Sequence, residues 1–275
     1  MTYRRPLLLV MAFGLICASC GSPHHANSLS SLSTATTEAP VTTSSTTTTH
    51  PGVVPAIGTK SFVKSTQAPV LVANITYPEL GGMASGQIEA NINAAISQAV
   101  TGFVSSFEAT ISGETSATPP GGSVNGVTQS QISGSFTNEL VDSRYVSFRF
   151  LVTTYSAGAA SPSTEAHSLT FNLSNGQLLT LTDLFSGSNY LSTLSSLARS
   201  ALASKLGKTA DPNFIDGGTQ PYAANFANWN LTASGLELTF SQGTVAASAT
   251  GVVTIIVPYS AVSTVANSSG PLTNP

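Results

Sequence analysis

A long apolar stripe on one predicted helix limits the folds that this chain can adopt. Between residues 88 and 107, apolar side chains recur three or four positions apart with Asn, Gln and Glu between them: Ile88, Ile92, Ile96, Ala99, Phe103 and Phe107. This spacing places them on one face of an α-helix. Such a face must be covered by another element, so the stripe requires a sheet or a second helix beside it.

Segments of alternating or continuously apolar side chains predict strands for such a sheet. They lie at residues 70–77, 131–140, 144–155, 167–173, 177–181, 229–231, 236–240 and 252–257. Asn175-Gly176 stands between two of them, which is a strong signal for a tight hairpin. Because the last segment is apolar on both faces, it is predicted to lie in the interior of a sheet.

A second helix is predicted for residues 189–206. Ser188 is a suitable N-cap, Gly207 is suited to end the helix, and apolar residues between them follow helical spacing. Strands interrupted by two long helices predict an α+β fold. We expect a mixed or antiparallel sheet with the two long helices packed on one side of it.

The folded part of the chain is expected to be a single α+β domain over residues 59–275. A Pro/Gly-rich segment at residues 115–126 predicts a loop. This loop leaves open a division into two subdomains, 59–127 and 128–267.

The first twenty residues have the pattern of a lipoprotein signal peptide. Arg4 and Arg5 precede an apolar stretch, residues 6–18, that is too short to span a bilayer. A small residue then precedes Cys20, so we expect lipidation of Cys20 and anchoring to the outside of a bacterial cell membrane. Cys17 stands where such signals usually carry an aliphatic residue, which leaves a freely secreted protein as the alternative.

Residues 21–58 are predicted to form a disordered tether. Fifteen of the twenty-two residues from Ser28 to Thr49 are Ser or Thr. Such a segment has too little apolar surface to offset the entropy lost on ordering. Cys17 and Cys20 are the only cysteines of the chain. The domain is therefore expected to be held by its core rather than by disulfides.

Charge limits the classes of partner. Only 8% of the residues are charged, and the formal net charge is −3. Nucleic acids and anionic lipid surfaces attract basic patches. We therefore expect no nucleic-acid partner, and contact with the membrane only through a lipidated Cys20.

No residue pattern typical of an enzyme stands out. His167 is the only histidine after residue 58, and it could act as a general base oriented by Glu165 on the same strand face. There is no G-x-S-x-G motif, so no serine nucleophile can be named. The simpler interpretation is a histidine at a strand end beside the core, and this is the one we favour.

The sequence predicts neither a metal site nor a cofactor. His24, His25 and His50 all lie in the predicted tether, and no histidines or cysteines are paired in the domain. The segment from Asp211 to Asp216 is the nearest to a calcium loop. However, Ile215 occupies a position where such a loop needs an oxygen ligand, so we predict a turn.

The polar face of the predicted strand 144–155 is the candidate ligand-binding surface. Tyr145, Arg149 and Tyr155 share this face and could form an aromatic and cationic platform for a protein or a glycan. Cross-strand pairing, or cover by a helix, would explain the same residues structurally.

Several short segments, taken in order, resemble one protein family. They are Tyr77-Pro78-Glu79-Leu80, the loop from Tyr155 to Pro162, Thr170-Phe171-Asn172-Leu173 with Asn175-Gly176, Leu181-Thr182-Asp183-Leu184-Phe185, and Val257-Pro258-Tyr259-Ser260. The family is the RsiV-like domain, also called domain of unknown function 3298. It occurs in RsiV-type anti-sigma factors, beside PdaC-type peptidoglycan deacetylase domains and in secreted mycobacterial antigens. The chain departs from it at Ser161, where family members often have a histidine.

The resemblance implies an extracytoplasmic domain that binds rather than catalyses, with lysozyme as the ligand of the sensor members. None of the sensors' ligand contacts can be placed on this chain by motif. We therefore expect a non-enzymatic, envelope-anchored domain that binds an extracellular protein or a cell-wall component of the lysozyme or peptidoglycan type. A secreted carboxylic ester hydrolase using His167 is one alternative, and a surface protein without a small ligand is another.

Overall fold

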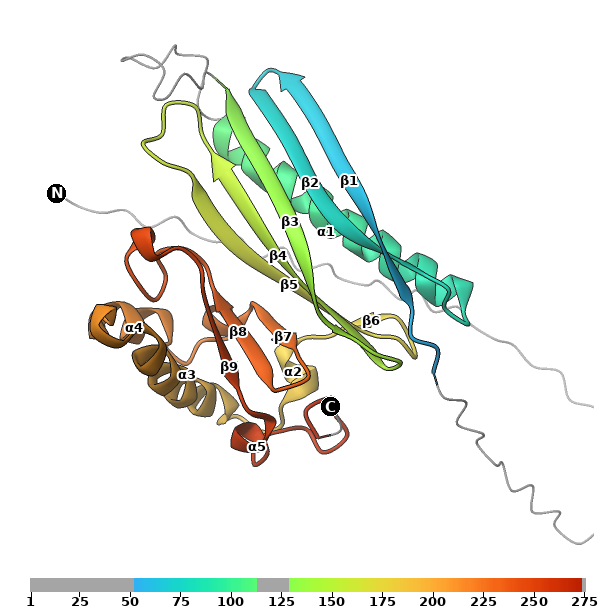
Figure 1. Cartoon of the computed structure of the whole chain (residues 1–275), viewed down its shortest axis with the longest axis vertical. Helices are drawn as coiled ribbons and strands as arrows, with labels where there is room; N and C mark the ends of the chain where they lie inside the picture. Colours follow the sequence, from blue (N-terminus) through green and yellow to red (C-terminus); the bar gives the residue numbers. More distant parts are fainter. Residues whose placement is uncertain (1–51, 113–128, 274–275) are drawn as a thin grey trace, which may run out of the picture. The chain divides into compact units, whose positions relative to one another are not determined.

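A computed structural model describes residues 52–112 and 129–273 of the chain (Figure 1). The predicted signal peptide with Cys20, residues 21–51 of the predicted tether and the predicted loop at 115–126 lie outside these residues.

The larger of two sheets is mixed and has six strands in the order β1-β2-β3-β4-β5-β6. Only β2 and β3 are parallel, because the helix α1 carries the chain across the sheet between them. The first strand follows no alternating apolar pattern and was not predicted from the sequence. The bounds are β1 Ala56–Gln67, β2 Val70–Gly81, β3 Ser130–Val141, β4 Tyr145–Tyr155, β5 Ser163–Asn172 and β6 Gln177–Leu178.

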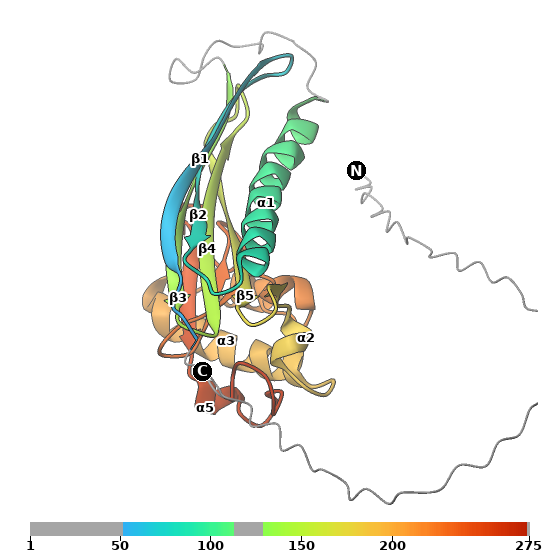
Figure 2. The ribbon, with the colours of Figure 1, turned by 90° about the vertical axis from the view of Figure 1, so that its right-hand side faces the viewer.

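Helix α1, Gly86–Ser112, lies along one face of this sheet (Figure 2). Its buried side chains are Ile92, Ile96, Val100, Val104, Phe107 and Ile111. The predicted stripe is thus confirmed, although Ile88, Ala99 and Phe103 lie at its half-buried edge. Asn93 attaches the helix to β2, because its side chain exchanges two hydrogen bonds with the backbone of Leu80.

A second, antiparallel sheet consists of β7 Trp229–Leu231, β8 Leu236–Phe240 and β9 Val253–Val257. It packs on the face of the larger sheet opposite to α1, near β4 and β5. Its other face is covered by α3, Tyr190–Leu206, which contributes Leu194, Ala198 and Leu202 to a second hydrophobic core. The predicted α+β class is confirmed, but the two long helices cover different sheets rather than one side of a single sheet.

The two hydrophobic cores are separated by a polar layer between the sheets. Ser147 of β4 and Asn230 of β7 are both fully buried, and the Asn230 amide donates to the Ser147 hydroxyl at 2.9 Å. The Ser168 hydroxyl of β5 donates to the Asn230 carbonyl oxygen at 2.8 Å. These bonds satisfy polar groups that would otherwise be buried without partners.

The prediction that residues 252–257 lie in a sheet interior is wrong. The corresponding strand β9 is at an edge, and the central strand is β8, which is buried along its whole length. Helix α3 packs against β9 and explains its apolar character, while Ile256 remains 46% exposed.

Short helices fill the connections of the C-terminal half. They are α2 Leu181–Leu184, η2 Gly207–Thr209, α4 Pro212–Gly218, η3 Ala223–Phe226, η4 Ser248–Thr250 and α5 Tyr259–Val262, with η marking 3-10 helices. The segment at Asp211, predicted to be a turn, begins α4: the Asp211 side chain accepts the backbone N–H of Asn213 as its N-cap.

Candidate functional site

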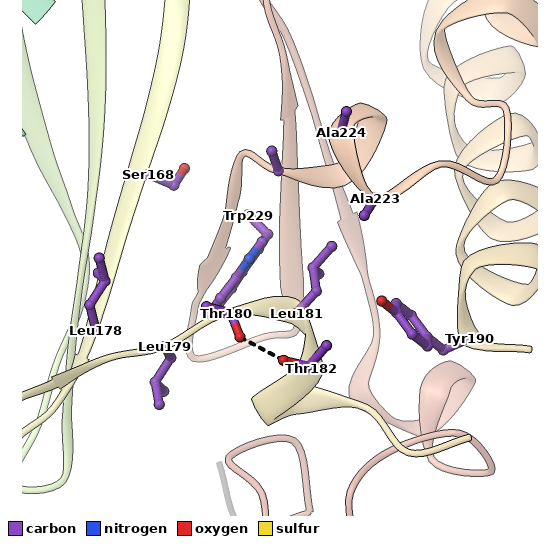
Figure 3. Close-up of a pocket in the computed structure, with 11 residues that line it drawn as sticks. Ser168, Leu178, Leu179, Thr180, Leu181, Thr182, Tyr190, Ala223, Ala224 and Trp229 are labelled. Atoms are coloured by element: carbon purple, nitrogen blue, oxygen red, sulfur yellow. Dashed lines mark hydrogen bonds between the residues drawn. The ribbon is translucent and has the colours of Figure 1, made fainter. Parts of the chain in front are cut away.

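A groove of about 430 Å³ lies where the β5–β6 hairpin, the start of α3 and β7 meet. Its lining consists of Ser168, Leu178, Leu179, Thr180, Leu181, Thr182, Tyr190, Ala223, Ala224, Ala227 and Trp229 (Figure 3). This set is named the Trp229 groove below. Its volume is in the range of small-ligand sites.

The hairpin between β5 and β6 brings the chain to the groove. The Asn175-Gly176 turn is confirmed, since β5 and β6 pair antiparallel and Gly176 has a positive φ of 75°. Gly176 also packs closely on α1, where an added Cβ would lie 3.3 Å from Ile88. After Leu178 the chain leaves the sheet and runs along the groove.

Helix α2 then holds two hydroxyl groups at the groove. The Asp183 carboxylate accepts both the backbone N–H and the hydroxyl of Thr180, each at 2.7 Å, which fixes the start of the helix. The hydroxyls of Thr180 and Thr182 lie 2.8 Å apart (Figure 3). They are polar groups on an otherwise mainly apolar wall.

Trp229 is the largest side chain of the groove and the only tryptophan of the chain. It is 5% exposed, because β7 pairs with β8 opposite Leu238 and the indole packs into the second core. Its indole N–H forms no hydrogen bond with any residue that the structure describes, and the nitrogen retains some accessible surface. A buried tryptophan N–H usually has a partner, so this donor is available to a ligand acceptor.

The lining of the groove carries no Asp, Glu, His, Lys or Arg. Tyr190 is its only titratable residue, and its ring stacks on Phe185 with centroids 5.0 Å apart. General acid–base catalysis needs a side chain that exchanges a proton near the operating pH. The groove is therefore suited to binding a neutral ligand rather than to acid–base chemistry.

His167 lies on the other side of the larger sheet, against α1. Its ring stacks on Phe103, with centroids 4.2 Å and planes 21° apart. Burial lowers the pKa of His167, and the negative charge of Glu165, 3.7 Å away, opposes this effect. Among residues 52–112 and 129–273, no serine hydroxyl forms a hydrogen bond with the imidazole. Within these ranges the structure therefore brings Glu165 to His167 but hydrogen-bonds no serine hydroxyl to it.

Arg149 lies between the two sheets, with its charge compensated inside the fold. Its guanidinium pairs with Glu139 at 2.9 Å and with Glu237 at 2.8 Å. Tyr145 packs against the second core, and the Tyr155 hydroxyl is buried without a hydrogen bond to any described residue. The contacts of Tyr145 and Arg149 fit the structural interpretation, and the three-residue platform stays a prediction.

In the part of the chain that the structure describes, no three His, Cys, Asp or Glu side chains are grouped as metal ligands. Asp211 caps α4, and Asp216 lies 3.1 Å from the Nε of Arg199. None of the helices within the described ranges combines the length and hydropathy needed to cross a bilayer. The predicted lipidation site, Cys20, lies outside these ranges.

Sequence reasoning did not find the Trp229 groove. Its residues come from six elements and the segments between them, and each has an ordinary role where it stands: Trp229 as a strand residue and Tyr190 as the first residue of a helix. The uniqueness of Trp229 was the only signal that could have singled it out.

Comparison with solved structures supports the fold. A crystal structure of a DUF3298 family member from Bacteroides fragilis is similar to this chain, with a TM-score of 0.60 and 15% identity, over 82% of this chain and 98% of that one. A DUF3298 family protein from Pseudomonas aeruginosa has a TM-score of 0.53 and 12% identity, over 77% and 95% of the two chains. No curated protein matches the chain significantly.

The family model described as "Protein of unknown function (DUF3298)" matches residues 182–260. The match begins in α2, at the Trp229 groove, and continues through α3 and the second sheet to α5. Of the segments on which the resemblance to the RsiV-like domain rested, the match includes Val257–Ser260 whole and Leu181–Phe185 from Thr182 onward. Residues 182–260 thus match the DUF3298 family, whose function is unknown, in agreement with the resemblance.

Proposed function

We propose that this chain is a non-enzymatic, lipid-anchored binding domain of the bacterial envelope, and that the Trp229 groove binds a neutral N-acetylated sugar of the cell wall. One observation carries the proposal: Trp229 is 5% exposed, its indole N–H lacks a partner among the described residues, and it lines an uncharged groove.

An acetamido group matches this lining. Its methyl group is apolar and suits the Leu179, Leu181 and Ala224 side of the groove, while its carbonyl oxygen is an acceptor for the indole N–H. Sugar hydroxyls can bond with Thr180 and Thr182, and a sugar ring can lie against an aromatic face. An anionic or cationic ligand would lack a countercharge here, since the lining has none.

The fluorescence of Trp229 provides a direct test, since it is the only tryptophan. The full chain is titrated with tri-N-acetylchitotriose and with soluble fragments of peptidoglycan. Cellotriose, which has hydroxyls where chitotriose has acetamido groups, is the control sugar. We expect a saturable change of emission with both N-acetylated ligands and none with cellotriose.

Two alanine variants separate groove binding from general effects. Ala224→Leu fills the groove and should weaken binding by about tenfold or more, a difference of about 1.4 kcal/mol. Ala249→Leu is the matched control, because Ala249 is also an exposed alanine in a 3-10 helix but does not line the groove. Equal affinity of both variants, or no response to either N-acetylated ligand, would refute the sugar site. If the protein binds lysozyme but neither N-acetylated sugar, its ligand is a protein rather than a sugar.

The anchoring part of the proposal rests on the sequence around Cys20 and has its own test. The mass of the mature N-terminal peptide should show an acylated cysteine at position 20. Cys20→Ala should release the protein from the membrane fraction. An unmodified N-terminus, or unchanged membrane association of the variant, would favour free secretion or another anchor.

A further inference from the structure

A second cavity, of about 470 Å³, lies beside the polar face of α3. It is lined by Ser192, Ser195, Ser196, Arg199, Ser200 and Pro221, and it shares no lining residue with the Trp229 groove. None of these side chains belongs to a predicted site or to the proposed sugar site.

Helical spacing brings the five side chains of α3 together. They occupy positions i, i+3, i+4, i+7 and i+8 counted from Ser192, so they form one face. The apolar face of the same helix carries Leu194, Ala198 and Leu202, which are fully buried in the second core. The polar face therefore stays turned away from the three-stranded sheet.

Two contacts hold the guanidinium of Arg199 in one orientation. Its Nε donates to the Thr219 hydroxyl at 3.1 Å, and it lies 3.1 Å from a carboxylate oxygen of Asp216. Thr219 is itself completely buried and donates to the backbone oxygen of Ile215 at 2.6 Å. The two terminal nitrogens of the guanidinium form no hydrogen bond with any residue in the described ranges. A held guanidinium presents these N–H groups as a planar fork.

Ser195 provides a second and independent sign of a ligand. The residue is 4% exposed and lines the cavity, one helical turn before Arg199. Its hydroxyl forms no hydrogen bond with the residues that the structure describes. The hydroxyl is therefore available to donate a hydrogen bond to a ligand in the cavity.

We propose that this cavity binds an oxyanion, a carboxylate or a phosphate group, between the terminal nitrogens of Arg199 and the hydroxyl of Ser195. The guanidinium and the four serine hydroxyls of the lining can all donate hydrogen bonds to an acceptor-rich ligand. The guanidinium fork matches the paired oxygens of both anions. Asp216 does not remove the attraction, because its side chain is 66% exposed and its charge is screened by water. The proposal is independent of the sugar site.

Nuclear magnetic resonance of the ¹⁵N-labelled full chain can test this site. Sodium phosphate and sodium acetate are titrated separately, with sodium chloride keeping the ionic strength constant. We expect saturable shifts of the Arg199 Nε–H signal and of the Ser195 amide signal. A response to phosphate alone would identify a phosphate site, and a response to acetate alone would identify a carboxylate site. A response to both anions would identify a general oxyanion site.

Conservative variants make the test specific. Arg199→Lys keeps the charge but loses the fork, and Ser195→Ala removes only the hydroxyl, so each should weaken binding by about threefold to tenfold or more. Arg144→Lys is the control, because Arg144 is an exposed arginine outside this cavity. Amide spectra of the variants verify that they are folded. Absence of saturable shifts with both anions, or affinities equal to the wild type in Arg199→Lys and Ser195→Ala, would overturn the proposal.

Discussion

Arg149 of β4 and Glu237 of β8 form an ion pair across the two sheets, with 2.8 Å between Nη1 and Oε1. Their side chains are 19% and 7% exposed, and the same guanidinium also pairs with Glu139 of β3. Burial raises the pKa of Glu237, and the positive charge of Arg149 opposes this effect. One cation thus compensates two carboxylates where the larger sheet meets the smaller one.

Removing Arg149 should destabilise the protein more than removing any exposed charge. Arg149→Met leaves two partly buried carboxylates without a countercharge, for which we expect a loss of about 3–5 kcal/mol in the free energy of unfolding. Lys60→Met is the control, because Lys60 pairs with Glu79 at the surface and should contribute less than about 1 kcal/mol. Urea denaturation measures both. Similar urea midpoints for the two variants would show that the ion pair between the sheets stabilises the protein no more than the surface pair does.

The stability of the protein should depend on His167 in a defined pH range. Since burial lowers the pKa of His167 below its ordinary value of 6.5, the unfolded chain binds a proton more readily than the folded one. The contribution of neutral His167 to the free energy of unfolding is therefore complete above pH 6.5. This contribution is lost as the pH falls through the pKa of His167 in the folded protein. His167→Phe retains the stacking on Phe103 and should flatten the stability profile in this range. Denaturation of both proteins at several pH values between about 5 and 7.5 checks this, and parallel profiles would contradict it.

Ester hydrolysis through His167 should be undetectable. The imidazole stacks on Phe103, and no serine hydroxyl within the described residues bonds to it. We expect the rate of hydrolysis of a short-chain aryl ester to equal that of the buffer, for the wild type and for His167→Ala alike. A measurable wild-type rate that His167→Ala abolishes would restore the hydrolase alternative.

Two adjacent glycines in α4 should respond in opposite directions to alanine. A Cβ at Gly217 would meet no atom within 4 Å, whereas one at Gly218 would lie 2.4 Å from the backbone oxygen of Thr244. Gly217→Ala should stabilise the protein by about 0.5–1 kcal/mol, because alanine loses less entropy in a helix. Gly218→Ala should destabilise it, since the backbone of residue 244 must move. Thermal unfolding of both variants is the measurement. Equal changes in stability would contradict the close approach of Gly218 to the backbone of Thr244.

Much of the fold could be predicted from the sequence because its signals are local. The stripe from Ile92 to Phe107, the Asn175-Gly176 turn and the end of α3 at Gly207 each depend on residues close together in the chain. The edge position of β9 and the strand β1 could not be predicted. An apolar strand has the same pattern whether a neighbouring strand or a helix such as α3 covers it, and β1 is recognisable only through its pairing with β2.

The sequence by itself determined the α+β class, the two amphipathic helices and the absence of cysteines after residue 20. Only the tertiary structure decided which polar residues are structural and which face a cavity. Arg149 and Arg199 have the same local signature, a cation on the polar face of its element, yet one lies between two carboxylates and the other borders an open cavity. The difference arises because Glu237 and Thr219, their partners, are 88 and 20 residues away in the chain. Contacts over such separations depend on how the layers pack, which no local pattern specifies.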